Sequence, residues 1–226
     1  GEIGGDETYG LFQSEQEIAG AANQYKVSGG IKLMPGDIRF VDRNNDGVID
    51  WGDNTVDNPG DKKIIGNSTP RYHYGINLGA DWKGFDLGIF FQGVGKRDLY
   101  LPGTSFRSHY GSEWQVPSAY NNDYWTEENT GAYFPRARFN GGSAINQAQT
   151  RYMVDASYCR LKSVSIGYTL PKVLTQKASI EKIRIYFTGE NLFTISDTPD
   201  GLDPELDNPY TYPMQRSLSV GLSLTF

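Results

Sequence analysis

The sequence predicts an all-β fold, and more specifically a segment of a transmembrane antiparallel β-barrel. The first observation is the final run of the chain, where positions 217–226 alternate between small and large apolar residues. The apolar members are Leu218, Val220, Leu222, Leu224 and Phe226. Because successive side chains of a strand point to opposite faces, this run has one oily face and one small, weakly polar face. Such a division is typical of a strand with lipid on one side and a wet lumen on the other.

Composition is the second observation. The 226 residues include 13% aromatic residues, 15 of them Tyr, and 27 Gly, which fits strands with interfacial aromatic belts and tight turns. No segment approaches the roughly twenty apolar residues of a membrane-spanning helix. The mean hydropathy of −0.53 does not argue against a barrel, since barrel strands need only about ten residues of alternating hydrophobicity. The net charge of −6 gives no indication of a nucleic-acid partner.

Four earlier segments show the same alternation. The cleanest of them runs from Tyr72 to Trp82, with aromatic or aliphatic side chains at even positions and small or polar ones at odd positions. In later runs Phe90 is an exception, and Arg160 with Lys162 breaks the pattern, so we expect that pair to lie outside the lipid zone. The predicted strands are 71–82, 84–94, 158–170, 182–193 and 216–226.

The connections between these strands alternate in length. Lys83-Gly84 is a minimal turn, whereas 95–157 and 194–215 are long. Because bacterial barrels have short periplasmic turns and longer external loops, we expect both long connections, and the whole of 1–70, to be extracellular. Residues 71–226 would then consist of the barrel strands together with these two extracellular loops. A soluble β-sandwich also alternates, but its outward face usually carries Lys, Glu and Thr instead of a Ser and Gly run.

Five strands are too few to close a barrel. Small barrels need about eight, and an open edge in lipid leaves unpaired backbone groups that cost several kcal/mol each. We therefore expect these residues to be the carboxy-terminal portion of a larger barrel.

An acidic segment at 42–53 has the spacing of a calcium-binding loop, D-R-N-N-D-G-V-I-D-W-G-D. Hard oxygen ligands at positions one, three, five, seven, nine and twelve, with Gly47 at six, converge on a cation of this size. The expected ligands are Asp42, Asn44, Asp46, the carbonyl of Val48, Asp50 and Asp53. The flanks do not predict two EF-hand helices, so the ion would be structural. The alternative is a solvated Asp/Asn-Gly turn that binds nothing.

The other candidate sites are weaker. Aromatic residues of the long connection are candidates for stacking on sugar rings, although such residues more often pin a loop to itself. They are Trp114, Tyr120, Tyr124 and Trp125. The acidic residues of the last connection, among them Asp203 and Glu205, are most simply a solvated loop. We find no nucleophile elbow, catalytic carboxylate pair or histidine ligand spacing, and we predict that the protein is not an enzyme.

Several motifs in a fixed order carry a family resemblance. They are Pro35-Gly36-Asp37-Ile38-Arg39-Phe40, Ile64-Ile65-Gly66-Asn67-Ser68-Thr69-Pro70, Tyr158-Cys159-Arg160-Leu161-Lys162, Gly167-Tyr168-Thr169-Leu170-Pro171, Gly189-Glu190-Asn191-Leu192-Phe193 and Gly201-Leu202-Asp203-Pro204-Glu205. With these motifs the chain resembles the SusC/RagA family of TonB-dependent outer-membrane transporters of Bacteroidetes-type bacteria, over nearly its whole length.

The resemblance implies a 22-stranded barrel in the outer membrane of a Gram-negative cell, the size class of transporters with a plugged lumen. It also implies import of glycans or peptides, a SusD-like surface lipoprotein as a lid, and energising by TonB. We expect the plug, the TonB box and the remaining strands to lie outside these 226 residues, as partners together with outer-membrane lipid. In this family a calcium-type loop would be structural. The alternative function is a secreted, calcium-stabilised β-type adhesin or carbohydrate-binding module.

Overall fold

The computed structural model describes residues 1–100, 123–138, 143–176, 179–199, 202–206 and 211–226. The chain divides into two compact units. The first consists of Gly1–Ser68 with Leu99–Val154, and the second of Thr69–Asp98 with Asp155–Phe226. Residues 99–154 thus lie between two strands of the second unit in sequence but belong to the first. They are held there by contacts such as Asp6 N to Ala148 O at 2.8 Å.

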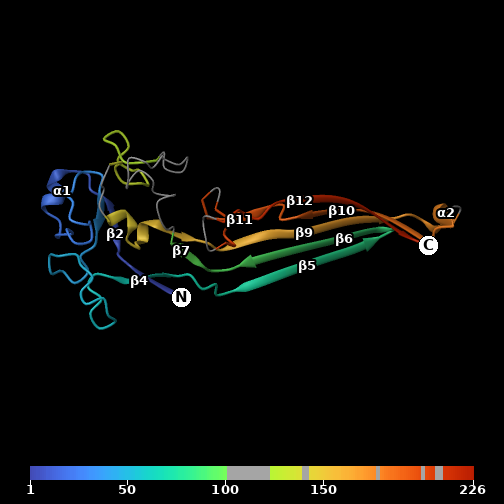
Figure 1. Ribbon diagram of the computed structural model, residues 1–226, viewed down its shortest axis with the longest axis horizontal. Helices are drawn as coiled ribbons and strands as arrows, with labels where there is room; N and C mark the ends of the chain where they lie inside the picture. Colours follow the sequence, from blue (N-terminus) through green and yellow to red (C-terminus); the bar gives the residue numbers. More distant parts are fainter. Residues whose placement is uncertain (101–122, 139–142, 177–178, 200–201, 207–210) are drawn as a thin grey trace. The chain divides into compact units, whose positions relative to one another are not determined.

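The second unit is one antiparallel sheet with the strand order β12-β10-β9-β6-β5 (Figure 1). In this part of the described chain, β5 and β12 form the edges and the sheet does not close. A short strand, β11 (Thr194–Ser196), also pairs with β9. The five long strands are β5 (His73–Trp82), β6 (Phe85–Val94), β9 (Tyr158–Thr169), β10 (Lys182–Glu190) and β12 (Ser217–Thr225).

The register of this sheet places the apolar residues of all five strands on one face. Residues directly opposite in a ladder share a face, so each register line is a row across the sheet. One row is Ala80, Leu87, Ile166, Phe187 and Val220. The adjacent row on the other face is Gly79, Gly88, Ser165, Thr188 and Ser219. The predicted fold class, an antiparallel barrel segment with one apolar and one small-polar face, is therefore confirmed.

A two-residue turn joins β5 to β6. Both of its residues have positive φ, 47° at Lys83 and 88° at Gly84, as required by a turn that matches the twist of a hairpin. A Cβ at position 84 would lie 2.8 Å from the carbonyl oxygen of Thr169. This turn, α2 (Lys172–Thr175) and the carboxy terminus lie at the same end of the sheet (Figure 1).

Two local features explain the breaks in alternation. Phe90 does lie on the small-polar face, where its ring covers Gly75, at which an added Cβ would be 3.1 Å from the ring. In β9, the register passes from Phe90↔Ser163 to Phe91↔Leu161, so Lys162 is the extra residue of a β-bulge. Because a bulge reverses the alternation beyond it, Arg160 shares the polar face with Gln92.

The first unit is built from short elements around a small apolar core. Its largest buried side chains include Phe12, Ile38, Ile49 and Tyr152. Strands β1 (Glu2–Gly5) and β4 (Lys63–Asn67) pair, as do β2 (Thr8–Leu11) and β3 (Ile38–Phe40). Its other short elements are α1 (Glu15–Ala19), η3 (Ala144–Asn146) and η4 (Thr150–Tyr152). Strands β7 (Asp98–Tyr100) and β8 (Met153–Asp155) pair with each other, and the sequence boundaries of the two units fall within them.

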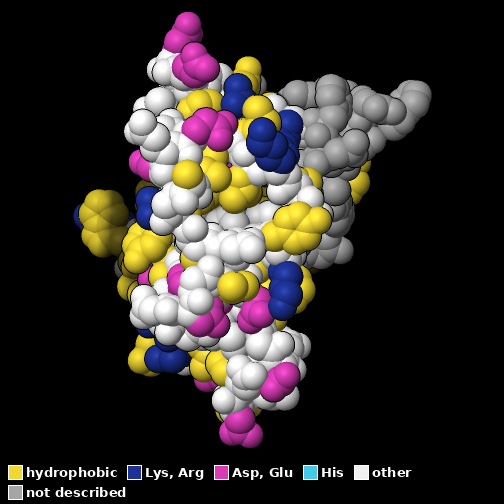
Figure 2. Space-filling model, turned by 90° about the vertical axis from the view of Figure 1, so that its left-hand side faces the viewer, with side chains coloured by type: hydrophobic (Ala, Val, Ile, Leu, Met, Phe, Trp, Pro, Cys, Tyr) yellow, Lys and Arg dark blue, Asp and Glu magenta, His cyan; other side chains and the backbone are white. Residues whose placement is uncertain are grey.

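The surface of the molecule on the side of α1 is mixed in character. Figure 2 shows acidic and basic side chains interspersed with apolar ones on this face. None of the helices in the described part of the chain is long and apolar enough to cross a membrane.

Candidate functional site

The apolar face of the five-stranded sheet is the most extensive candidate surface. Val220 is 79% exposed and Leu222 60%, and large apolar side chains are also exposed on β5, such as Leu78. A soluble protein rarely leaves a contiguous apolar surface of this extent to water. The face therefore requires an apolar environment. Strands β5 and β6 have ten residues each, the length with which barrel strands cross the hydrocarbon layer.

The opposite face carries long polar side chains that lie flat over glycine positions. Arg184 Nε donates to Asp86 Oδ2 at 3.0 Å, and this ion pair passes over Gly167, where a Cβ would lie 2.2 Å from the Asp86 carboxylate. The guanidinium of Arg184 is also 4.7 Å from the ring centroid of Tyr186, which in turn covers Gly221. Glycine at 167 and 221 thus allows polar side chains to bridge neighbouring strands across this wall.

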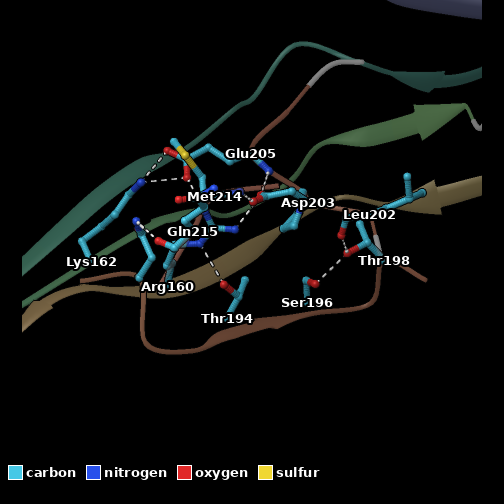
Figure 3. A network of polar contacts seen from close by, with 12 residues as sticks. Arg160, Lys162, Thr194, Ser196, Thr198, Leu202, Asp203, Glu205, Met214 and Gln215 are labelled. Carbon is cyan, nitrogen blue, oxygen red and sulfur yellow. Dashed lines mark hydrogen bonds and ion pairs between the residues drawn. The ribbon is translucent and has the colours of Figure 1, made fainter. Parts of the chain in front are cut away.

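A buried polar network lies at the other end of the sheet (Figure 3). The guanidinium of Arg160 donates to Asp203 Oδ1 at 2.5 Å, to Glu205 Oε2 at 2.7 Å and to Thr194 Oγ1 at 2.8 Å. Lys162 Nζ donates to both carboxylate oxygens of Glu205 at 2.8 Å. The two basic residues come from the bulge of β9, and the two acids come from the segment after β11, so the network fastens that segment to the sheet.

Asp203 is the central acceptor of this network. Besides Arg160, its carboxylate accepts the backbone N–H groups of Glu205 at 3.0 Å and Met214 at 2.9 Å. Burial raises the pKa of Asp203, but the hydrogen bonds from Arg160 and the two backbone groups outweigh it and hold the pKa below its ordinary value. Asp203 is therefore a carboxylate at neutral pH.

The expectation of a solvated acidic loop is wrong for Asp203 and Glu205. The side chain of Asp203 is 4% exposed, as is that of Arg160. The sequence did carry a signal of this arrangement, namely the two basic residues that interrupt the alternation of β9, but their acidic partners lie about 43 positions further along the chain. Nothing local connects the two segments.

The acidic loop at 42–53 is ordered by its own side chains. The carboxylate of Asp42 accepts the backbone N–H groups of Asn45 at 2.7 Å and Gly47 at 2.9 Å, and Asp46 Oδ1 accepts that of Val48 at 2.8 Å. Asn44 Oδ1 accepts the N–H of Asp46 at 3.0 Å. Each of these oxygens keeps a further lone pair, so the donor chemistry fits a hard cation.

The second half of the loop has other partners. Lys26 Nζ donates to Asp50 Oδ2 at 2.9 Å and thereby holds the pKa of Asp50 below its ordinary value. Asp53 Oδ2 accepts the side-chain amide of Asn58 at 2.8 Å. Within the described residues, no three His, Cys, Asp or Glu side chains are grouped closely enough to hold a metal ion.

The aromatic candidates of the long connection differ in their surroundings. Trp125 is buried; its Nε1 donates to Gln13 Oε1 at 3.2 Å, and Arg136 lies 5.3 Å from its ring centroid. Gly36 lies against the same ring, where a Cβ would be 2.6 Å from Trp125. Tyr124 is 36% exposed, and Trp114 and Tyr120 fall outside the described residues. Trp125 therefore packs within the first unit, against Gln13, Gly36 and Arg136.

Several curated proteins are similar to this chain in sequence. TonB-dependent receptor P3 of Formosa agariphila is 32% identical over 210 residues, which is 85% of this chain and 19% of that protein. TonB-dependent receptor P26 of the same organism is 28% identical over 234 residues, covering 96% of this chain and 22% of the relative. TonB-dependent receptor SusC of Bacteroides thetaiotaomicron is 29% identical over 194 residues, 83% of this chain and 17% of SusC. No protein-family model matches the chain.

Solved structures agree with the fold. The structure of the RagAB peptide transporter superimposes with a TM-score of 0.69 at 21% identity, covering 100% of this chain and 23% of the matched chain. Its "open-open" state gives a TM-score of 0.66. This likeness supports the fold, an antiparallel sheet like part of the matched transporter chain.

Fold and exposed apolar face together define a segment of a transmembrane β-barrel. The chain is homologous to a part of the TonB-dependent receptors of the SusC/RagA type, as the motifs predicted. It spans about a fifth of the length of the curated relatives it matches. These receptors are outer-membrane proteins of Gram-negative bacteria, which is also the location of this chain.

Proposed function

We propose that this chain is part of the wall of an outer-membrane nutrient importer driven through TonB. The observation that carries the proposal is the register that aligns the apolar residues of five strands on one exposed face. The relationship to TonB-dependent receptors supports transport as the activity and gives no support for enzymatic chemistry.

The proposed cargo is a glycan or a peptide, and the proposed partner is a SusD-like surface lipoprotein. The pairing named in the RagAB peptide transporter supports both a partner and a peptide cargo. The test is to tag the complete protein in its own organism, purify it from outer membranes in detergent, and identify what copurifies. We expect a surface lipoprotein, and we expect deletion of the gene to abolish growth on one defined glycan or peptide source while growth on simple sugars is unchanged.

A protein that stays monodisperse without detergent and does not sediment with membranes would overturn the proposal of an importer. It would favour the secreted adhesin or carbohydrate-binding module instead.

We also propose that the loop at 42–53 binds a structural calcium ion. Its oxygen donors Asp42, Asn44 and Asp46 support this, and the ammonium of Lys26 would have to leave Asp50. Calcium titrated into the chelator-treated complete protein should raise its thermal unfolding temperature. Asp46→Asn should abolish that rise, whereas Asp57→Asn, at an exposed position outside the ligand set, should leave it intact. An equal rise in wild type and Asp46→Asn would reject the site.

A further inference from the structure

The polar network around Arg160 depends on the β-bulge at Lys162. On the carboxy-terminal side of the bulge in β9, Val164 and Ile166 share the apolar face with Ile89 and Leu87. Continued alternation would put position 160 on that same face, in lipid. The extra residue reverses the alternation, so the guanidinium of Arg160 is directed to the polar face instead. The bulge thus re-aims one basic side chain at the cost of a local irregularity, which is a common use of bulges next to functional sites.

The segment fastened by this network, here called the strap, consists of residues 197–199 and 202–206, which follow β11 along the chain. β11 itself belongs to the sheet, where Ile195 pairs with Cys159 on the apolar face. The hydrogen bonds of the strap to its surroundings include those from Arg160 and Lys162 and that from Arg97 to the carbonyl oxygen of Pro204 at 3.0 Å. The strap is therefore attached mainly through charges and hydrogen bonds.

An open, polar cavity of about 310 Å³ accompanies the strap. Its lining includes Arg160, Thr194, Leu202, Asp203 and Pro204. Close packing normally fills the space between an element and the surface that supports it. A segment that borders such a cavity and is tied by ion pairs at one end can be released without disrupting an apolar core.

The ion pairs form two tiers. Arg160 and Asp203 are both 4% exposed, whereas Lys162 and Glu205 are 17% and 20% exposed. Glu205 joins the tiers, because it accepts from Arg160 and from Lys162. Water and dissolved ions reach the outer tier first, so release of the strap would begin between Lys162 and Glu205.

We propose that Arg160, Lys162, Asp203 and Glu205 form an ionic latch that holds the strap over the polar face of the sheet, and that opening the latch uncovers the polar wall beneath it. Val94 and Tyr158, which share this face with Arg160, are 4% and 5% exposed in the latched state. The low pKa of Asp203 keeps the inner pair charged at neutral pH. The consequence for import rests on the proposed function, whereas the latch itself is a property of the fold.

Hydrogen–deuterium exchange of the complete protein in detergent tests the latch without any transport measurement. The amides of residues 197–199 and 202–206 report the strap, and those of the β5–β6 hairpin report the sheet. We expect strap exchange to be faster by about tenfold in Asp203→Asn and by about threefold in Glu205→Gln, with the hairpin unchanged, because loss of a buried charge-assisted bond favours local opening. Asp197→Asn is the matched control; it removes an acid of the same strap that makes no ion pair in the described structure, and strap exchange should stay within about twofold of wild type.

Charge reversal separates a latch from simple packing. Lys162→Glu should speed strap exchange more than Lys162→Gln, because the glutamate repels Glu205 whereas the glutamine only removes the attraction. The proposal is overturned if Asp203→Asn and Asp197→Asn exchange alike, or if Lys162→Glu exchanges no faster than Lys162→Gln. If Asp203→Asn loses the hairpin protection as well, the variant has misfolded, and Glu205→Gln with the two Lys162 variants decides.

Discussion

Two adjacent residues of β12 provide a matched test of which face of the sheet meets lipid. Val220 lies on the apolar face in the row with Phe187 and Ile166, and Ser219 lies on the opposite face in the row with Thr188. The strand has nine residues, or about 30 Å at roughly 3.4 Å per residue. Val220 is one residue from its middle, which places it close to the centre of the hydrocarbon layer.

Arginine at these two positions should have very different effects. At the midplane of a barrel, a lipid-facing Arg costs about 2–4 kcal/mol, whereas lumen-facing substitutions mainly tune selectivity. We therefore expect Val220→Arg to lower the free energy of unfolding by about 3 kcal/mol and Ser219→Arg to lower it by less than about 1 kcal/mol. Urea unfolding of the complete protein in lipid vesicles, followed by heat-modifiable gel migration, measures both. Equal costs, or a larger cost for Ser219→Arg, would refute the assignment of the faces.

Three further predictions concern single residues. Burial raises the pKa of Asp6 to about 6, so the contribution of Asp6 to stability is greatest below its unfolded pKa and falls as pH rises to about 6. Denaturant unfolding between pH 4 and 8 should show a loss of about 2.5 kcal/mol that Asp6→Asn lacks and Asp57→Asn retains. Gly36→Ala should lower the free energy of unfolding by about 3 kcal/mol, because the new Cβ is forced against Trp125. Gly10 also has a positive φ but has open space around it, so Gly10→Ala should lower the free energy of unfolding by only about 1 kcal/mol in the same assay. Equal losses in the two variants would show that the contact with Trp125 is irrelevant. Lys83 has a φ of 47°, so Lys83→Asn should stabilise the β5–β6 turn by about 0.5 kcal/mol, and a loss of stability would indicate that the contact of Lys83 with the Trp82 ring at 5.0 Å matters more.

The sequence predicts the strands well because their signal is local. A period of two is visible within each segment, as in the run from Leu218 to Phe226, and it sets which residues share a face. How neighbouring strands align is not local, since it depends on turn geometry and on irregularities such as the bulge at Lys162. That bulge was visible only as a break in the alternation, and its purpose became clear from the partners of Arg160.

The loop contacts were harder to predict from sequence. Asp203 resembles any residue of an acidic surface loop until the fold brings it to Arg160. Trp125 was a candidate for stacking on sugars, but in the first unit it contacts Gly36 and Arg136. Gly36 precedes it by about ninety positions in sequence, and Arg136 follows it by about ten. The calcium loop stays a prediction from spacing, because hydrogen bonds of Asp42 and Asp46 order the loop with or without an ion.

The most direct measurement is a scan of spin labels along β12 in the complete protein, reconstituted in lipid. Single cysteines placed at each position from 217 to 225 except Gly221, which Tyr186 covers, in a background where Cys159 is replaced, would be tested for collision with oxygen, which concentrates in lipid, and with a water-soluble nickel complex. We predict high oxygen accessibility at Leu218, Val220, Leu222 and Leu224 and high nickel accessibility at Ser219 and Ser223, which lie between them. Accessibility without this alternation, or low oxygen accessibility at the four leucine and valine positions, would contradict a sheet whose apolar face meets hydrocarbon.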